Sequence, residues 1–270
     1  MPGKIVIIGT GVMGGALLKV LAAQGPEQVT HLVAVDIDEI RLEALHLELG
    51  VATSTSAQAA VVDAEIVVLA VKPWVVPAVL TEIRVTLPPE ATLISIAAGV
   101  RLAVLEEFLS PQTPVVRGMP NTPALIGAGI TALALGSSAT EKHLELASTV
   151  LGQLGSVVTV SENSLDAVTG LSGSGPAYVY LFIEALIDAG VREGLSRHIA
   201  RKLALETVIG SARLVRETGE HPAKLKDAVT TPGGTTIAAL AALESGGFRG
   251  LVFDAVHCAT EVSRQLGKGD

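Results

Sequence analysis

Gly9, Gly11 and Gly14 have the Gly-x-Gly-x-x-Gly spacing of a turn that holds a dinucleotide pyrophosphate. An apolar run of strand length, residues 4–8, precedes these glycines, and a helical pattern follows them. In such a turn the first glycine permits the tight bend, the second lets the backbone approach the phosphates, and the third lets the helix pack closely on its strand. Backbone N–H groups and the positive end of the helix dipole would then face the anion. An ordinary glycine-rich turn between a strand and a helix is the alternative interpretation.

A carboxylate stands at the end of the second apolar run, His31–Val35. Asp36 lies roughly 20 residues beyond Gly14, where a dinucleotide-binding fold places an acid that accepts hydrogen bonds from the adenosine ribose. Because a carboxylate at this position repels a 2′-phosphate, Asp36 favours NADH over NADPH. Alternatively, Asp36 only caps the helix that begins at Asp38, which would leave the cofactor preference open.

Two more loops follow predicted strands at the carboxyl edge of the sheet, where open α/β sheets bind their ligands. Val71-Lys72-Pro73 follows the strand that ends at Ala70, and Lys72 faces either a cofactor or solvent. Small residues from Ser95 to Gly99, including Ala97, end another strand and leave room for a nicotinamide ribose.

The loop Met119-Pro120-Asn121-Thr122-Pro123 follows a further strand, and two prolines restrict its backbone. Asn121 and Thr122 carry polar groups that suit a carboxamide or a substrate. A purely structural turn is the alternative interpretation of this loop.

Two glycine-rich segments, Leu171–Tyr178 and Val229–Thr236, interrupt the helical second part of the chain. The second segment predicts an anion-binding turn, because Pro232 fixes the approach and Gly233-Gly234 exposes backbone N–H groups. Thr235-Thr236 then opens a helix whose dipole favours a carboxylate. Simple helix caps are the alternative for each segment, although the hydroxyl groups in the second outnumber those that capping needs.

The other chemistry-bearing residues form no recognisable catalytic group. No set of His, Cys, Asp and Glu residues has metal-ligand spacing, and so no metal is expected. The helix after Gly175 offers Tyr178, Tyr180 and Glu184, but it has no lysine that could accept a proton from an alcohol. A cationic imine needs no strong acid in order to accept a hydride, and the missing lysine therefore weakly favours imine chemistry.

Strand and helix patterns alternate in the first part of the chain, which predicts an α/β fold with a doubly wound, mostly parallel sheet. After about Glu162 only helical patterns follow, so we place a boundary near Ser161–Ser164, between a dinucleotide-binding domain (residues 1–161) and a helical domain (residues 162–270). The predicted strands are Lys4–Ile8, His31–Val35, Glu65–Ala70, Ala91–Ser95, Pro114–Arg117, Ile130–Leu135 and Ser156–Val160. The main predicted helices are Asp38–Leu49, Trp74–Val85, Leu102–Leu109, Thr140–Leu151, Pro176–Glu193, Arg197–Thr218 and Gly247–Leu266.

The composition limits the classes of partner. Hydrophobic residues make up 49% of the 270 residues and the mean hydropathy is +0.53, so a monomer would expose much aliphatic surface and an oligomer is expected. The net charge of −8 argues against nucleic acid as a partner. Cys258 is the only cysteine, which suits a reducing cytoplasm. Neither a signal peptide nor a membrane span is expected.

These motifs, in this order, resemble pyrroline-5-carboxylate reductase, the family that catalyses the last step of proline biosynthesis. The most specific likeness lies in Leu171–Tyr178 and in Leu225–Leu240, which is followed by Leu243-Glu244-Ser245-Gly246-Gly247-Phe248-Arg249. Ala70–Pro73 and Met119–Pro123 also match loops of the family, and the likeness runs along the whole chain.

The resemblance implies a Rossmann domain followed by an all-α dimerisation domain, with dimers that interlock through their helices and often assemble as a decamer of five dimers. It also implies hydride transfer from NADH or NADPH to the imine carbon of L-1-pyrroline-5-carboxylate, a small-molecule substrate, to give L-proline. Many relatives use NADPH and carry Ser, Asn or Arg after the second strand. The segment Asp36-Ile37-Asp38 departs from that pattern and puts a preference for NADPH in doubt.

The motifs and the resemblance together give a set of expected functional residues. The catalytic candidate is Thr236, whose hydroxyl would bond the ring nitrogen or the carboxylate of the substrate. The expected substrate-binding residues are Thr231, Gly233, Gly234, Thr235, Thr236 and Ser174. The expected cofactor-binding residues are Gly9, Gly11, Val12, Met13, Gly14, Asp36, Ala70, Val71, Lys72, Pro73, Ala97 and Asn121.

Two other functions are alternatives at the level of sequence. A 3-hydroxyisobutyrate-type dehydrogenase has a similar two-domain plan, but it would need a lysine on the helix after Gly175. A dinucleotide-sensing protein without catalytic activity would bind NADH, but it would not need the second anion site at Thr230–Thr236.

Overall fold

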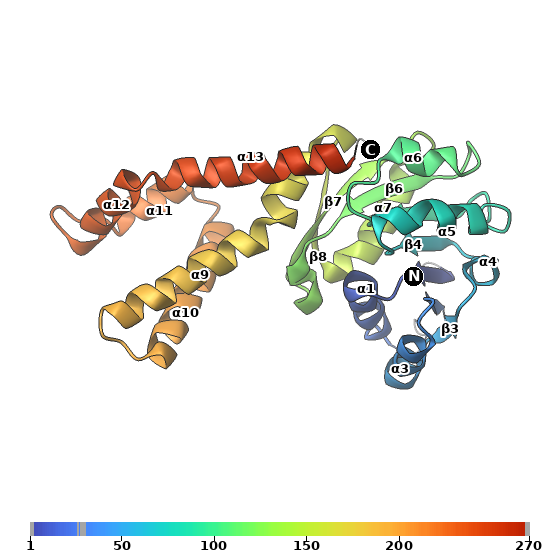
Figure 1. Ribbon diagram of the computed structural model, residues 1–270, viewed down its shortest axis with the longest axis horizontal. Coiled ribbons are helices and arrows are strands. Elements are labelled where there is room, and N and C mark those ends of the chain that lie inside the picture. Colours follow the sequence, from blue (N-terminus) through green and yellow to red (C-terminus); the bar gives the residue numbers. More distant parts are fainter. Residues whose placement is uncertain (1–2, 26, 28–30, 268–270) are drawn as a thin grey trace. The chain divides into compact units, whose positions relative to one another are not determined.

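The computed structural model describes residues 3–25, 27 and 31–267. The chain divides into two compact units (Figure 1). The first unit comprises Met1–Gly173 together with Ala259–Asp270, and the second comprises Ser174–Cys258.

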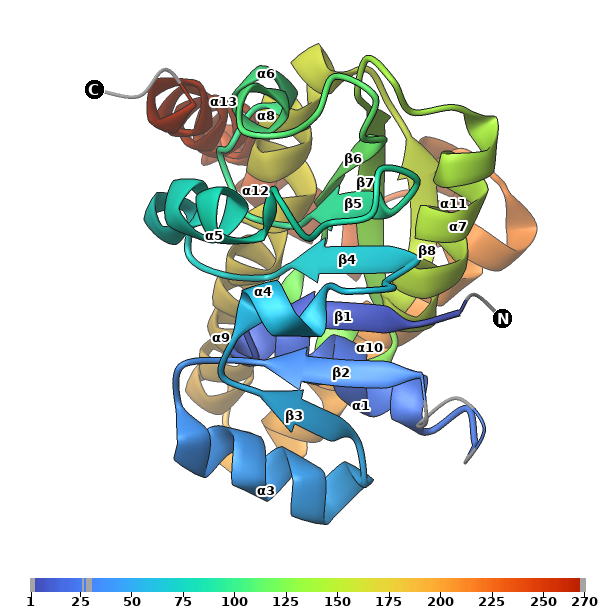
Figure 2. The same ribbon diagram turned by 90° about the vertical axis from the view of Figure 1, so that its right-hand side faces the viewer.

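The first unit contains an eight-stranded sheet in the order β3-β2-β1-β4-β5-β6-β7-β8. Figure 2 shows the parallel part of this order, with β1 between β2 and β4. Neighbouring strands are parallel except for the antiparallel pair β6–β7, so the predicted doubly wound, mostly parallel sheet is confirmed. The strands are β1 (Ile5–Ile8), β2 (Leu32–Val35), β3 (Ala52–Ser54), β4 (Ile66–Leu69), β5 (Thr92–Ser95), β6 (Val115–Met119), β7 (Gly129–Leu135) and β8 (Gly155–Thr159).

Helices cover both faces of this sheet, which explains why β1 is apolar throughout rather than alternating. Ile5 and Ile7 pack into one core with residues of α1, α3 and α7, whereas Val6 and Ile8 pack into a second core with residues of α4, α5 and α6. The helices are α1 (Val12–Ala22), α3 (Glu39–Leu49), α4 (Ala57–Ala60), α5 (Val76–Ile83), α6 (Leu102–Glu107), α7 (Glu141–Leu151) and α8 (Leu165–Val168). Short turns are η1 (Pro73–Val75), η2 (Thr122–Ile126), η3 (Gly152–Leu154), η4 (Glu162–Ser164) and the π-helical η5 (Thr169–Gly173).

The second unit consists of helices. Its first helix, α9, packs against α10, which follows it in the chain. Gly190 of α9 and Ala200 of α10 approach so closely that a Cβ on Gly190 would lie 3.0 Å from the Ala200 Cβ. No residue of α9 is buried in the single chain, and large apolar side chains such as Leu181 and Phe253 are 67% and 72% exposed. This unit therefore carries a large apolar surface of the kind that a partner subunit covers. Its elements are α9 (Gly175–Arg192), α10 (Arg197–Thr218), α11 (Pro222–Ala228), α12 (Thr235–Ser245) and the first part of α13 (Phe248–Leu266).

The compact units differ from the domains predicted from sequence, which meet at residues 161 and 162. The difference arises because η4, α8 and η5 pack with the sheet rather than with the later helices, and because the chain from Ala259 onward also belongs to the first unit. Leu165, for example, is fully buried in the core that contains β4 and β5.

Among the described residues, no single helix has the length and apolar character needed to cross a membrane. Taken together, α12 and α13 meet both criteria, but the chain bends by 50° between them.

Candidate active site

The glycine turn after β1 has a backbone that only glycine accommodates at two of its three positions. Gly9 has φ +95°, and an added Cβ would lie 2.8 Å from the backbone of Ala70 at the end of β4. A Cβ on Gly14 would collide with the carbonyl oxygen of Gly9, so α1 packs directly on the turn. The two roles predicted for Gly9 and Gly14, a tight bend and close helix packing, are therefore visible in the structure.

Gly11 differs from its two neighbours in the motif, because an added Cβ would meet nothing within 4 Å. Gly11 is the N-cap of α1, has extended backbone and supplies no capping side chain. The first intrahelical bond runs from the Gly15 N–H to the Gly11 carbonyl, so the N–H groups of Val12, Met13 and Gly14 have no intrahelical acceptor. This open cradle at a helix N-terminus fits a pyrophosphate.

Asp36 is fixed at the end of β2 by the same turn. Its Oδ2 accepts hydrogen bonds from the Thr10 N–H at 2.8 Å and from the Thr10 hydroxyl at 2.7 Å, and its Oδ1 accepts one from the Asp38 N–H at 3.2 Å. Burial alone would raise the pKa of this carboxyl, but these hydrogen bonds and the Arg41 guanidinium hold the pKa below its ordinary value. Asp36 is therefore ionised at neutral pH.

The helix cap is Asp38 rather than Asp36. Asp38 Oδ1 accepts a hydrogen bond from the Arg41 N–H at 3.0 Å, and α3 begins at Glu39. The alternative reading of Asp36 as a simple cap is thus excluded. Arg41 lies 3.3 Å from Asp36 Oδ2 and 3.1 Å from Asp38 Oδ2, so its charge is already shared between two carboxylates.

Thr10 is the residue of this site that the motif did not identify. It occupies the variable position between Gly9 and Gly11, and its side chain is buried against Asp36. A hydroxyl residue at that position followed by an acid after the second strand is a signal that could have identified the pair.

The other predicted cofactor residues of the first unit lie beyond the carboxyl ends of β4, β5 and β6. Ala70, Val71 and Pro73 are partly buried, Ala97 is buried, and Lys72 is exposed and forms no ion pair within the described ranges. The Asn121 side chain instead joins two segments, because its Nδ2 donates to the Ser172 carbonyl at 3.1 Å and its Oδ1 accepts from the Ile130 N–H at 2.9 Å. These bonds favour a structural role for the Asn121 side chain, and its contact with a cofactor stays a prediction.

The predicted substrate turn lies in the second unit, before α12. The Gly234 N–H donates to the Thr231 carbonyl at 3.0 Å, and Gly233 has φ +68°, so Pro232-Gly233 occupies the corner of a tight turn. A Cβ on Gly234 would collide with the Thr231 hydroxyl oxygen, so a larger residue there would turn the Thr231 side chain aside.

Unbonded donors gather where this turn meets α12. Gly234 is the N-cap of α12 and supplies no capping side chain, so the first N–H groups of the helix have no intrahelical acceptor. In the part of the chain that the structure describes, the hydroxyls of Thr231, Thr235 and Thr236 make no hydrogen bond. Thr230 differs, because its hydroxyl donates to the Lys226 carbonyl at 2.7 Å. The turn therefore has the donors that a carboxylate requires, and Thr230 has a structural role.

Ser174, the remaining predicted substrate residue, is the N-cap of α9. It also supplies no side-chain cap, although its carbonyl accepts the Ala177 N–H at 3.0 Å. Over residues 3–25, 27 and 31–267, no group of three or more His, Cys, Asp and Glu side chains could hold a metal ion.

An open, mostly parallel sheet with a glycine turn and an ionised acid at its carboxyl edge defines a dinucleotide-binding protein of the Rossmann type. Comparison with known proteins agrees, because residues 4–99 match the family model described as NADP oxidoreductase, coenzyme F420-dependent. Residues 162–266 match the model described as pyrroline-5-carboxylate reductase dimerisation. The chain belongs to the pyrroline-5-carboxylate reductase family, as its resemblance predicted.

Named relatives match over nearly their whole length. The pyrroline-5-carboxylate reductase of Synechocystis sp. is 45% identical, with 97% of each chain covered. That of Escherichia coli is 40% identical, with 99% of this chain and 100% of the relative covered. Among solved structures, a pyrroline-5-carboxylate reductase from Coxiella burnetii has a TM-score of 0.93 at 33% identity, covering 98% of this chain and 99% of that one. The Plasmodium falciparum pyrroline carboxylate reductase, solved with NADP bound, has a TM-score of 0.87 at 33% identity and covers 98% of both chains.

Gly11 and Gly14 give a matched pair of variants that separates binding from folding. Gly11→Ala should change the free energy of unfolding by at most about 1 kcal/mol, because its backbone suits alanine and the space is open. The new methyl group would stand over the unbonded N–H groups, so the Kd for NADH should rise about tenfold or more. Gly14→Ala should instead lower the free energy of unfolding by about 1–3 kcal/mol, because its methyl group meets the Gly9 carbonyl.

Chemical denaturation and titration of nicotinamide fluorescence measure the two effects. A Gly11→Ala protein that binds NADH as tightly as the wild type would contradict the assignment of this turn to the pyrophosphate.

Proposed function

We propose that this chain reduces L-1-pyrroline-5-carboxylate to L-proline with a hydride from NADH or NADPH, the last step of proline biosynthesis. The observation that carries the proposal is the turn at Thr231–Thr236, which presents unbonded hydrogen-bond donors. It is the second such set in the chain, and the first set, at the start of α1, suits a dinucleotide. Membership of the pyrroline-5-carboxylate reductase family supports it along the whole length of the chain.

Residues of the first unit would bind and orient the cofactor. The N–H groups of Val12, Met13 and Gly14 would hold the pyrophosphate, and Asp36 would accept hydrogen bonds from the adenosine ribose. The small residues around Ala97 would leave room for the nicotinamide ribose. When bound, NADH or NADPH supplies the hydride that reduces the imine carbon.

Residues of the second unit would bind the substrate. The carboxylate would accept hydrogen bonds from the N–H groups at the start of α12 and from the hydroxyls of Thr231 and Thr235. Thr236 is only partly exposed, and its hydroxyl would form a hydrogen bond with the ring nitrogen or the carboxylate of the substrate. The ring nitrogen takes up a proton before the hydride adds, either from solvent or from that hydroxyl, which then regains a proton from solvent. Positioning then supplies most of the catalysis, because a protonated imine accepts hydride without a strong acid.

A steady-state assay with pyrroline-5-carboxylate and each cofactor tests the function. The expected result is oxidation of NADH or NADPH that depends on substrate and yields proline in equal amount. Absence of oxidation with both cofactors, in a protein that is folded by circular dichroism, would remove the proposal.

Within this function we propose that NADH is the preferred cofactor. Asp36 is ionised and its carboxylate faces the turn, where a 2′-phosphate would meet a like charge. Arg41 does not offset this repulsion, because it is paired with Asp36 and Asp38.

Asp36→Asn should move the ratio of kcat/KM for NADPH to that for NADH upward by about tenfold or more, since it removes the negative charge and leaves Arg41 paired with Asp38 alone. Glu43→Gln, which removes an exposed charge from α3, the helix that carries Arg41, is the matched control and should leave the ratio unchanged. Equal ratios for Asp36→Asn and wild type would show that Asp36 does not set the preference.

Thr236→Ala should lower kcat/KM for the substrate by about tenfold or more, because it removes a hydroxyl bonded to a charged ligand. Thr236→Ser keeps the hydroxyl and should retain most of the activity. Both variants should bind NADH as the wild type does. An unchanged kcat/KM in Thr236→Ala would remove the role of this hydroxyl.

The protein self-associates through its helical region, which matches the family's dimerisation model over residues 162–266. We propose a dimer that covers the exposed apolar side chains of this region, with five dimers forming a decamer as the resemblance implies. The single cysteine, Cys258, supports a cytoplasmic location.

A further inference from the structure

The loop between β5 and α6, residues 96–101, is supported by two segments that lie far from it in the sequence. The loop contains Ala97, proposed above to lie beside the nicotinamide half of the cofactor, and it ends at Arg101, the N-cap of α6. The supporting segments are residues 162–168 of η4 and α8, and residues 263–267 at the end of α13. The loop and both supports belong to the same compact unit.

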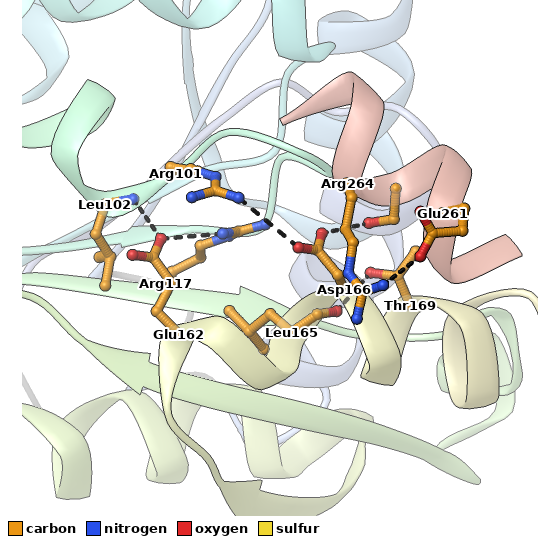
Figure 3. Close-up of polar contacts among 10 residues, drawn as sticks. Arg101, Leu102, Arg117, Glu162, Leu165, Asp166, Thr169, Glu261 and Arg264 are labelled. Carbon is orange, nitrogen blue, oxygen red and sulfur yellow. Dashed lines mark hydrogen bonds and ion pairs between the residues drawn. The ribbon is translucent and has the colours of Figure 1, made fainter. Parts of the chain in front are cut away.

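Two carboxylates hold the end of the loop (Figure 3). Glu162 Oε1 accepts hydrogen bonds from the Leu102 N–H at 2.6 Å and from Arg117 Nη1 at 3.0 Å. The Arg117 side chain is only 6% exposed, so this pair fixes the first turn of α6 to strand β6. Asp166 Oδ2 lies 3.9 Å from Nη2 of Arg101, the residue that precedes Leu102, and forms an ion pair with it.

The last turn of α13 completes this support. Ser263 is 4% exposed and donates its hydroxyl to Asp166 Oδ1 at 2.7 Å, so that Asp166 bridges Ser263 and Arg101. Gly99 has φ +78°, and an added Cβ would lie 3.6 Å from the Leu266 Cβ. The loop therefore runs beside the end of α13, and its Arg101 side chain is linked to that helix through Asp166.

Polar contacts rather than apolar packing hold the far side of this loop. Arg101, Arg117, Glu162, Asp166 and Arg264 line a cavity of about 200 Å³. This space leaves room for the Arg101 side chain to move when one of these bonds is removed.

We propose that Ser263 is a positioning residue for the cofactor. Its hydroxyl holds the Asp166 carboxylate where that carboxylate also meets Arg101, and Arg101 ends the loop against which the nicotinamide half binds. The inference rests on the proposed reductase function, because that function assigns residues 96–101 to the nicotinamide half of NADH or NADPH.

Two ligands distinguish a positioning role from a structural one, because ADP lacks both the nicotinamide and the ribose that carries it in NADH. Ser263→Ala should raise the Kd for NADH about fivefold, the effect of one hydrogen bond, and should leave the Kd for ADP unchanged. Ser263→Thr keeps the donor and should restore NADH binding. Gln265→Ala, an exposed neighbour on the same turn, is the matched control and should change neither Kd.

Asp166→Asn is a second variant, at the other bond of the same link. It keeps the size of the side chain but removes the charge that pairs with Arg101. It should also weaken NADH selectively. Nicotinamide fluorescence gives the Kd for NADH, calorimetry gives that for ADP, and a thermal melt of each variant reports stability.

Selective loss of NADH binding with rescue by Ser263→Thr supports the proposal. Equal weakening of both ligands, or an unchanged Kd for NADH in both Ser263→Ala and Asp166→Asn, overturns it while leaving the reductase function intact. A wild-type protein that neither binds NADH nor oxidises it would fail earlier, at the proposed function itself.

Discussion

Two helices of this chain begin at a glycine that cannot cap them, and the rest of the site depends on this constraint. Gly11 precedes α1 and Gly234 precedes α12, and both have extended backbone and no capping side chain. Backbone N–H groups at such helix starts need an acceptor, which water supplies until an anion binds. The first start suits a pyrophosphate and the second a small carboxylate, so a single physical device explains both ligands of the proposed reaction.

The surroundings of each glycine keep these N–H groups open. Close approach of Gly9 to Ala70, and of Gly14 to Gly9, holds the first turn against the sheet without filling the space over Gly11. Thr10 then ties the turn to Asp36, so the residues that hold the phosphates and those that select the ribose form one bonded unit. Cofactor binding and cofactor choice are in this way set by neighbouring residues that directly follow β1 and β2.

The sequence predicted the elements that depend on local pattern and missed features that depend on long-range contacts. The seven apolar runs interpreted as strands are all strands, whereas β3 was missed because it is three residues long and mostly exposed. Asp38 rather than Asp36 caps α3, because the Arg41 N–H donates its hydrogen bond to the Asp38 carboxylate. The bonds of Asn121 to Ser172 and of Glu162 to Leu102 join residues far apart in the chain, and no local spacing signals them. The split of α13 between two compact units has the same origin, since it follows from tertiary packing alone.

In the proposed reaction a hydride passes from the nicotinamide to the imine carbon of pyrroline-5-carboxylate on this protein. The measurement that tests this step is turnover with NADH or NADPH that carries deuterium at both positions of nicotinamide C4, followed by mass spectrometry of the product. The expected product is proline that carries one deuterium at ring carbon C5. Unlabelled proline, or no proline at all from a folded protein that binds both ligands, would contradict it.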